Sequence, residues 1–181
     1  SPLPYTSARL NTQNKVDWKY GRFEMRAKLP QGQGTWPAFW MMPTNSIYGE
    51  WPRSGEVDIL EAVNLKTVNS EGVAEASVVG QLYYGSAWPN QSGTGKEYDL
   101  PDGVNPADDF HTYAIEWQEG EFRWYVDGYL YQTQRASTVR YNSKGEAVGL
   151  AHKGWFAEFF DAVTGELVPH YDAAPFDQEF Y

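Results

Sequence analysis

The strongest constraint on the fold of this chain is an alternation of apolar and polar residues with a period of two. Phe23, Met25, Ala27 and Leu29 alternate with charged residues, so an extended chain would bury one face and expose the other. Similar strand-like patterns predict strands over residues 5–12, 16–29, 35–42, 56–63, 77–84, 111–118, 121–134 and 155–160. No stretch predicts a helix of more than one or two turns.

The segments between these strands have the composition of turns. Asp127 and Gly128 lie between two strand-like runs and predict a two-residue hairpin. Gly, Pro, Asn and Ser predict loops over residues 30–34, 87–96 and 101–109. Many short strands joined by such turns indicate an all-β, antiparallel sandwich. We expect one domain over residues 1–181, curved so that a polymer can lie in an open cleft on its concave face.

Composition excludes several functional classes. The chain has no cysteine, so it has neither a disulfide framework nor a thiolate metal site. No apolar run approaches the length of a membrane span. The net charge of −10 disfavours nucleic acid and heavily sulfated polysaccharides, whereas a neutral polymer is not repelled. Because the chain begins with Ser1 rather than Met, we expect a processed piece of a larger protein.

Aromatic residues give a positive indication. Phe, Trp and Tyr make up 17% of the chain, with 8 Trp and 13 Tyr. Rings in this number indicate a surface groove lined with flat apolar faces, on which the C–H faces of sugar rings can stack. An aromatic-rich β core is the alternative for any single ring.

A cluster of carboxylates in residues 54–63 carries the candidate chemistry. Alternation along a strand puts Glu56 and Asp58 on the same face. Strict alternation would then expose Leu60 and bury Glu61. One extra residue, a β-bulge at Ile59 and Leu60, returns Leu60 to the core and puts Glu61 beside Asp58. The pattern therefore predicts three acids in a row on one face.

Three neighbouring carboxylates titrate as a coupled set, because like charges raise the pKa of at least one member. A retaining glycosidase needs such a set, with one ionised carboxylate to attack the anomeric carbon and one protonated acid for the leaving oxygen. The alternatives are a solvated acidic face and a calcium site. Calcium ligands usually come from a flexible loop rather than a strand.

The segment 54–61, Ser-Gly-Glu-Val-Asp-Ile-Leu-Glu, resembles the active-site signature of glycoside hydrolase family 16, and in particular that of bacterial laminarinases, which are endo-1,3-β-glucanases. Four other segments and one near the chain end resemble that group in order and spacing: residues 7–10, 20–24, 34–40, 110–117 and 175–178. Together they cover most of the chain.

This resemblance implies a concanavalin-like jelly roll and hydrolysis of β-1,3-glucosidic bonds in laminarin-like glucans with retained anomeric configuration. It assigns Glu56 as nucleophile, Asp58 as the assisting acid and Glu61 as acid/base. The residues that it implies for substrate binding, each of which also fits a structural role, are Trp36, Trp40, Trp51, His111 and Arg26. Because a polymeric substrate cannot cross a bacterial membrane, we expect a secreted or cell-surface bacterial protein. We also expect a monomer whose partners are β-glucan polysaccharides and oligosaccharides, without a membrane or nucleic-acid partner.

Some features depart from the family pattern. Leu82-Tyr83-Tyr84 stands where laminarinases commonly have a histidine, residues 143–165 have no clear counterpart, and family strands are missing at both ends. The resemblance implies no catalytic cofactor or catalytic metal, and it allows a structural calcium ion. An agarase, a mixed-linkage β-glucanase and a non-catalytic carbohydrate-binding module remain alternative functions.

Overall fold

The computed structural model describes residues 5–181 and is nearly all β-structure. Its helical content within these residues is one three-residue 3₁₀ turn. The elements are β1 (Gly21–Ala27), β2 (Ala38–Met41), β3 (Glu56–Glu61), β4 (Ser77–Gly85), β5 (Gln91–Asp99), η1 (Pro101–Gly103), β6 (His111–Gln118), β7 (Glu121–Val126), β8 (Tyr129–Arg135), β9 (Thr138–Tyr141), β10 (Ala147–His152), β11 (Ala157–Phe160) and β12 (Leu167–His170).

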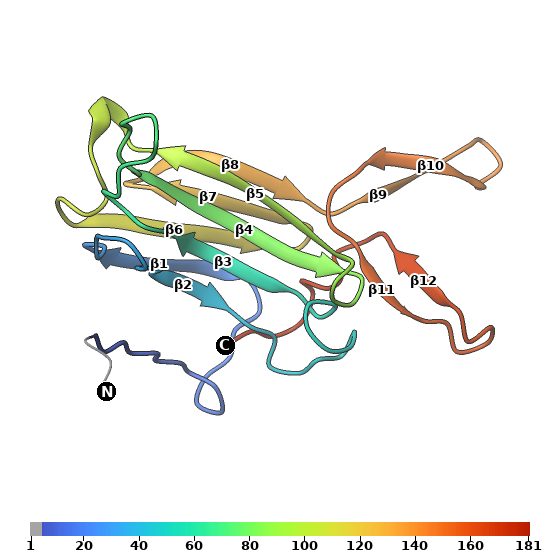
Figure 1. Cartoon of the computed structure of the whole chain (residues 1–181). Coiled ribbons are helices and arrows are strands. Elements are labelled where there is room, and N and C mark those ends of the chain that lie inside the picture. The colour runs from blue at the N-terminus through green and yellow to red at the C-terminus, as the bar shows by residue number, and fades with distance from the viewer. Residues whose placement is uncertain (1–4) are drawn as a thin grey trace.

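Two sheets pack face to face (Figure 1). One has the strand order β1-β6-β7-β8, and the other has the order β12-β11-β4-β3-β2, with β5 also paired to β4. All of these pairs are antiparallel except a single parallel pair between β11 and β4. The hairpins β9–β10 and β11–β12 project from one end of the sandwich (Figure 1). The predicted all-β, antiparallel jelly-roll class is confirmed.

The core lies between the two sheets and consists of side chains from alternate strand positions. Val57 and Leu82 come from one sheet, and Ile115, Phe122 and Trp124 come from the other, all fully buried. Burying side chains of this size contributes about 1.5–3 kcal/mol each through the hydrophobic effect. This alternation is what leaves the opposite face of β3 free to carry polar groups.

The predicted bulge and the predicted hairpin are both present. The register of β3 shifts against β2 between the pairs Phe39↔Leu60 and Trp40↔Asp58, and against β4 between Asp58 and Glu61. One extra residue in β3 accounts for both shifts. In the predicted hairpin, Asp127 and Gly128 connect β7 to β8. Their φ angles are 48° and 78°, and a type I′ turn requires such positive values at both residues.

The loop predicted over residues 87–96 is correct for residues 87–90 and wrong beyond them, because β5 occupies Gln91–Asp99. The sequence of β5 is polar and glycine-rich, so it lacks the apolar alternation from which a strand is predicted. Its order comes from nine backbone pairs with β4. Gly93 and Gly95 suit these positions because the side chain of Gln81 occupies the space that a Cβ would need.

The strand predicted over residues 5–12 is also wrong. These residues belong to no assigned strand, and the side chains of Tyr5 and Leu10 are exposed. Their apolar groups therefore add nothing to the core that would hold the segment against a sheet. Residues 143–165, for which the sequence indicated no clear family counterpart, contribute β10, β11 and the turns next to them.

The end of the chain anchors the start of β3. Phe176 and Phe180 are fully buried, and the side chain of Gln178 donates a hydrogen bond to the carbonyl oxygen of Ser54 over 3.0 Å. Gly55 has a φ of +89°, and a Cβ there would lie 2.7 Å from the ring of Phe176. Glycine thus allows the C-terminal segment to pack directly beneath the residue that precedes Glu56.

Candidate active site

The three acids lie on the middle strand of a three-strand platform. Within the paired register of β2, β3 and β4, Glu56 faces Tyr83, Asp58 faces both Trp40 and Gln81, and Glu61 faces Ala38 and Val79.

The acids differ in exposure. Asp58 is only 2% exposed, while Glu56 and Glu61 are partly exposed at either end of the row. The bulge brings Glu61 to this face, as the sequence predicted. The outer acids can therefore meet a ligand from solvent, whereas Asp58 lies beneath them.

Burial raises the pKa of Asp58 far above its ordinary value, and the charges of Glu56 and Glu61 raise it further. Burial also raises the pKa of Glu56, although a hydrogen bond from Trp51 and the hydrogen bond with Asp58 oppose this change. Asp58 Oδ2 is buried and has no hydrogen-bond partner among the described residues, so an ionised Asp58 would lack solvation. The burial of Asp58 and the hydrogen bonds to Glu56 together favour a protonated Asp58 that donates a hydrogen bond to an ionised Glu56.

Each of the two outer acids accepts a hydrogen bond from an indole N–H group. Trp36 Nε1 donates to Glu61 Oε1 over 2.8 Å, and Trp51 Nε1 donates to Glu56 Oε2 over a short contact. Both tryptophans are substantially exposed, so their ring faces are accessible while their N–H groups orient the acids. The structure thus brings together two predicted binding residues and the two predicted reactive carboxylates.

Further aromatic rings extend this surface. The ring centroid of Trp51 lies 6.1 Å from that of Tyr83 and 6.1 Å from that of Trp88. On the other side of the acids, the guanidinium of Arg9 lies over the ring of Trp40, 4.6 Å from its centroid. The rings therefore continue on both sides of the carboxylates, as expected for a surface that binds several sugar units.

A hollow of about 1,100 Å³ lies on the β2 side of the acid row and is lined in part by Trp36, the hydrogen-bond partner of Glu61. Its walls come from residues 5–10, from residues 30–37 and from the rings of Trp36 and Trp40. A volume of this size is large for a small-molecule site. It can accommodate part of a chain-like ligand that continues past Glu61.

The remaining two predicted binding residues lie elsewhere. Arg26 is on β1, where Met25 and Ala27 pack toward the core, so its side chain is on the outer face of the other sheet. Its guanidinium lies 4.7 Å from the ring centroid of Phe110. The structure does not bring Arg26 to the acid row.

His111 begins β6, in the same sheet as Arg26, and its Nδ1 lies 2.6 Å from Asp127 Oδ2. Its side chain is 12% exposed. The geometry gives His111 a local partner at the β7–β8 turn and does not pair it with any of the three acids.

Sequence reasoning missed Gln81, Tyr83, Trp88 and Arg9 as neighbours of the acids. Gln81 and Tyr83 were detectable in principle, since they alternate with the buried Leu82 and so share one face of β4. Trp88 and Arg9 lie outside regular strands, so no periodic pattern could place them.

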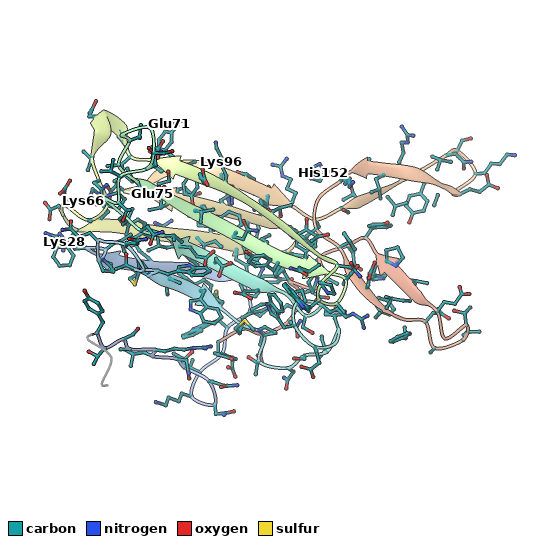
Figure 2. The ribbon with its side chains drawn as sticks, in the orientation of Figure 1. Lys28, Lys66, Glu71, Glu75, Lys96 and His152 are labelled. Carbon is teal, nitrogen blue, oxygen red and sulfur yellow. The ribbon has the colours of Figure 1, made fainter. Side chains whose placement is uncertain are left out.

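Three lysine side chains, Lys28, Lys66 and Lys96, lie apart from this row (Figure 2). Lys28 and Lys66 lie at the end of the sandwich away from the β11–β12 hairpin, and Lys96 lies on β5 (Figure 2). Lys66 is paired with Asp108, and Lys96 Nζ donates to the carbonyl oxygen of Tyr131 over 3.0 Å. The positive charge of Arg9, in contrast, acts to lower the pKa of Glu56.

Metal and membrane sites gain no support from the described residues. Within residues 5–181, no group of three His, Cys, Asp or Glu side chains is arranged to hold a metal ion. The structural calcium ion that the resemblance allowed therefore gains no support from these residues. None of the helices in this range is long and apolar enough to cross a membrane.

The fold and the site together define a carbohydrate-active β-sandwich, in which coupled carboxylates sit among exposed indole rings. Comparison with known proteins identifies the family to which this β-sandwich belongs. The sequence profile of glycosyl hydrolases family 16 matches residues 4–167. The chain belongs to this family.

Similar proteins cover most of the chain. Glucan endo-1,3-beta-glucosidase A1 of Niallia circulans is 35% identical over 177 residues, which are 98% of this chain and 21% of that protein. The beta-1,3-glucan-binding protein of Penaeus monodon is 37% identical over 183 residues, covering 98% of this chain and 45% of that protein. The laminarinase structure from Rhodothermus marinus aligns with a TM-score of 0.60 and 33% identity, covering 93% of this chain and 54% of that one. The chain thus spans between about a fifth and about half of these proteins.

Proposed function

We propose that this chain hydrolyses internal β-1,3-glucosidic bonds of a laminarin-like glucan and retains the anomeric configuration. The observation that carries the proposal is the row of Glu56, Asp58 and Glu61, in which a buried middle acid is hydrogen-bonded to one outer acid and an indole N–H orients each outer acid. Two carboxylates with separate roles are what retaining glycosidases require.

In the first step of this mechanism, the Glu56 carboxylate attacks the anomeric carbon while Glu61 donates its proton to the glycosidic oxygen. The bond between that carbon and oxygen breaks, and an ester between Glu56 and the sugar forms. Asp58 keeps its proton and donates a hydrogen bond to Glu56, which stabilises the ionised nucleophile before attack.

In the second step, the ionised Glu61 takes a proton from a water molecule, whose oxygen attacks the same carbon. The ester breaks, Glu56 regains its charge, and Glu61 is again protonated. Two displacements at one carbon restore the original configuration. No cofactor takes part, because the carboxylates and water supply all of the groups transferred.

Several observations favour a neutral β-1,3-glucan as the substrate. The Niallia circulans protein is named a glucan endo-1,3-beta-glucosidase, and the Rhodothermus marinus protein is named a laminarinase. The net charge of −10 disfavours a sulfated polymer. Exposed rings on both sides of the acids suit a long chain cut at an internal bond. Because such a polymer does not cross a membrane, we place the site of action outside a bacterial cell.

Glucan binding without hydrolysis is the second candidate function. The similarity to a beta-1,3-glucan-binding protein of Penaeus monodon favours it. Hydrolysis fits this chain better, because all three acids are present and coupled, and binding alone gives no reason for a buried Asp58 beside two further acids.

Substitution of the outer acids tests the assignment. Glu56→Ser is expected to abolish laminarin hydrolysis and to preserve laminari-oligosaccharide binding measured by calorimetry. Glu61→Gln is expected to lower the rate on laminarin by about 10²–10⁴-fold and to lower it far less on an aryl β-glucoside oligomer with an activated leaving group. Hydrolysis by Glu56→Ser would overturn the nucleophile assignment.

A proton NMR time course on laminari-oligosaccharides tests the stereochemistry of the reaction. Retention predicts that the β-anomer of the new reducing end appears first. First appearance of the α-anomer would exclude the double displacement and leave the hydrolase assignment intact.

A further inference from the structure

Two buried side chains of the opposite sheet donate hydrogen bonds to backbone groups at the bulge in β3. Trp124, on β7, donates from Nε1 to the carbonyl oxygen of Asp58 over 2.9 Å. Gln132, on β8, donates from Nε2 to the carbonyl oxygen of Gly80 over 3.1 Å. Trp124 is fully buried and Gln132 is 7% exposed. Both donors therefore reach across the core to backbone groups rather than to side chains.

The two accepting carbonyl groups belong to the two strands on which the bulge acts. Asp58 is the last residue of β3 before the extra residue, and Gly80 lies between the residues of β4 that face Asp58 and Glu61. A bulge disrupts the hydrogen-bonded ladder at these positions. A buried carbonyl group without a partner is costly, so donors from across the core stabilise this irregular geometry.

The donors are arranged as a unit. Trp124 and Gln132 are direct register partners in the β7–β8 ladder, so their side chains arrive side by side at the inner face of β3 and β4. Gly80 provides the necessary space, because a Cβ there would lie 2.3 Å from Trp124 Cδ1 and 2.5 Å from Trp124 Nε1. The close packing of Trp124 therefore depends on glycine at position 80.

We infer that Trp124 and Gln132 are positioning residues, which fix the bulge of β3 and thereby hold Glu61 in line with Glu56 and Asp58. This inference rests on the proposed function only for its kinetic consequence. The bulge is the feature that turns Glu61 onto the face of the acids, so any loss of its geometry misaligns Glu61 before it affects Glu56. Neither Trp124 nor Gln132 touches the substrate in this account.

Trp124→Phe removes the indole donor and retains a buried aromatic ring, and Gln132→Met removes the amide and retains a side chain of similar length. Trp155→Phe is a matched control, because Trp155 is also buried, also packs on Phe122 and donates to the carbonyl oxygen of Ala173 over 3.2 Å. All three variants lose a hydrogen bond from a buried side chain to a backbone carbonyl group. Only the first two lose one at the bulge.

The kinetic experiment compares laminarin with a 2,4-dinitrophenyl β-glucoside oligomer, whose leaving group needs no proton. Trp124→Phe and Gln132→Met are expected to lower kcat/KM, which reports the glycosylation step alone, by about 100-fold on laminarin and by less than about tenfold on the aryl substrate. Trp155→Phe is expected to lower the Tm and leave the ratio of the two rates unchanged. Equal ratios in all three variants would overturn the inference.

A titration separates this inference from the proposed function. Carbon-13 NMR of the side-chain carboxyl groups follows protonation of the three acids without any substrate. Trp124→Phe and Gln132→Met are expected to alter the coupled titration, and Trp155→Phe to leave it as in the wild type. If the wild type does not hydrolyse laminarin, the proposed function fails, and this titration still decides the inference. A wild-type titration in both bulge variants would overturn it, and Gln132→Met decides the outcome if Trp124→Phe does not fold.

Discussion

At the scale of single residues, the site depends on the separation of charge between neighbouring carboxyl groups. Asp58 is buried and its pKa is strongly raised, while hydrogen bonds to Glu56 oppose the rise in the pKa of that group. Burial therefore assigns the proton to the middle acid and the charge to the outer one. This division makes the stability of the protein and its activity depend on pH in different ways.

The raised pKa of Asp58 predicts how stability changes with pH. Below about pH 4, Asp58 is protonated in the folded and unfolded states alike. Above that pH the unfolded chain releases the proton and the folded protein keeps it, so the free energy of unfolding falls as pH rises toward the folded-state pKa. Asp58→Asn removes this dependence. Thermal unfolding should show the Tm of the variant rising relative to the wild type between pH 4 and pH 8. A constant or shrinking difference would contradict a protonated Asp58.

The hydrogen bond from Trp51 predicts a shift in the activity profile. This bond lowers the pKa of Glu56, and Glu56 must be ionised to attack. Trp51→Phe should therefore move the acidic limb of kcat/KM on laminarin to higher pH. Trp88→Phe is the control, because Trp88 packs beside Trp51 and neither Glu56 nor Asp58 owes its pKa change to it. An acidic limb at the same pH in both variants would exclude this role for Trp51.

At the scale of elements, β3 connects the local sequence to the site. The positions of Leu60 and Glu61 were sufficient to predict its bulge, because each would otherwise face the wrong environment. The hairpin at Asp127 and Gly128 was predictable for a similar reason, since few residues accept its backbone geometry. Both features are determined by residues that lie close together in the sequence.

Other elements are not determined by their local sequence alone. The polar strand β5 is ordered by pairing with β4, and residues 5–12 show a strand-like pattern without finding a partner strand. Arg26 and His111 lie on the other sheet and not beside the acids. The two errors in the elements, and the separation of these two residues from the acids, all depend on which strands pair and which faces meet. Strand pairing and the packing of sheet faces are long-range properties, which cannot be read from the local pattern of one sequence.

The residue before β3 gives an element-scale prediction. Gly55→Ala places a Cβ against the ring of Phe176 at a φ of +89°, and Gly34→Ala has the same φ with nothing within 4 Å. The control isolates backbone strain, about 1–2 kcal/mol, and Gly55→Ala adds overpacking of about 1–3 kcal/mol. Urea unfolding should show the larger loss in Gly55→Ala. Equal losses would show that Phe176 does not restrict this position.

At the scale of the whole molecule, the C-terminal segment contacts residues that lie far from it in the sequence. Trp18 and Pro43 both form bridges with Phe180, and Trp117 Nε1 donates to the carbonyl oxygen of Phe176 over 3.2 Å. The C-terminal segment thus joins β2, β3 and β6. Its resemblance motif at residues 175–178 was visible in the sequence, but its structural role was not.

This arrangement predicts that Phe176 is a major determinant of stability. Its ring is fully buried and lies within 5.4 Å, between centroids, of Phe122 and Trp155. Phe176→Ala should lower the free energy of unfolding by about 3–5 kcal/mol through loss of packing and a residual cavity. Phe160→Ala is the control, since that ring is 64% exposed, and it should cost less than about 0.5 kcal/mol. Similar values in a urea titration would contradict the anchoring role of the C-terminal segment.

The central claim is that this chain cuts β-1,3-glucan with Glu56 as its nucleophile. The most direct measurement is the release of reducing ends from laminarin, barley mixed-linkage glucan and agarose, with Glu56→Ser as the blank. We expect release of reducing ends from laminarin by the wild type and none by Glu56→Ser. Cleavage of only another of these polymers would overturn the substrate and keep the reaction class. No release from any polymer, with laminari-oligosaccharide binding intact, would contradict hydrolysis and favour a glucan-binding protein.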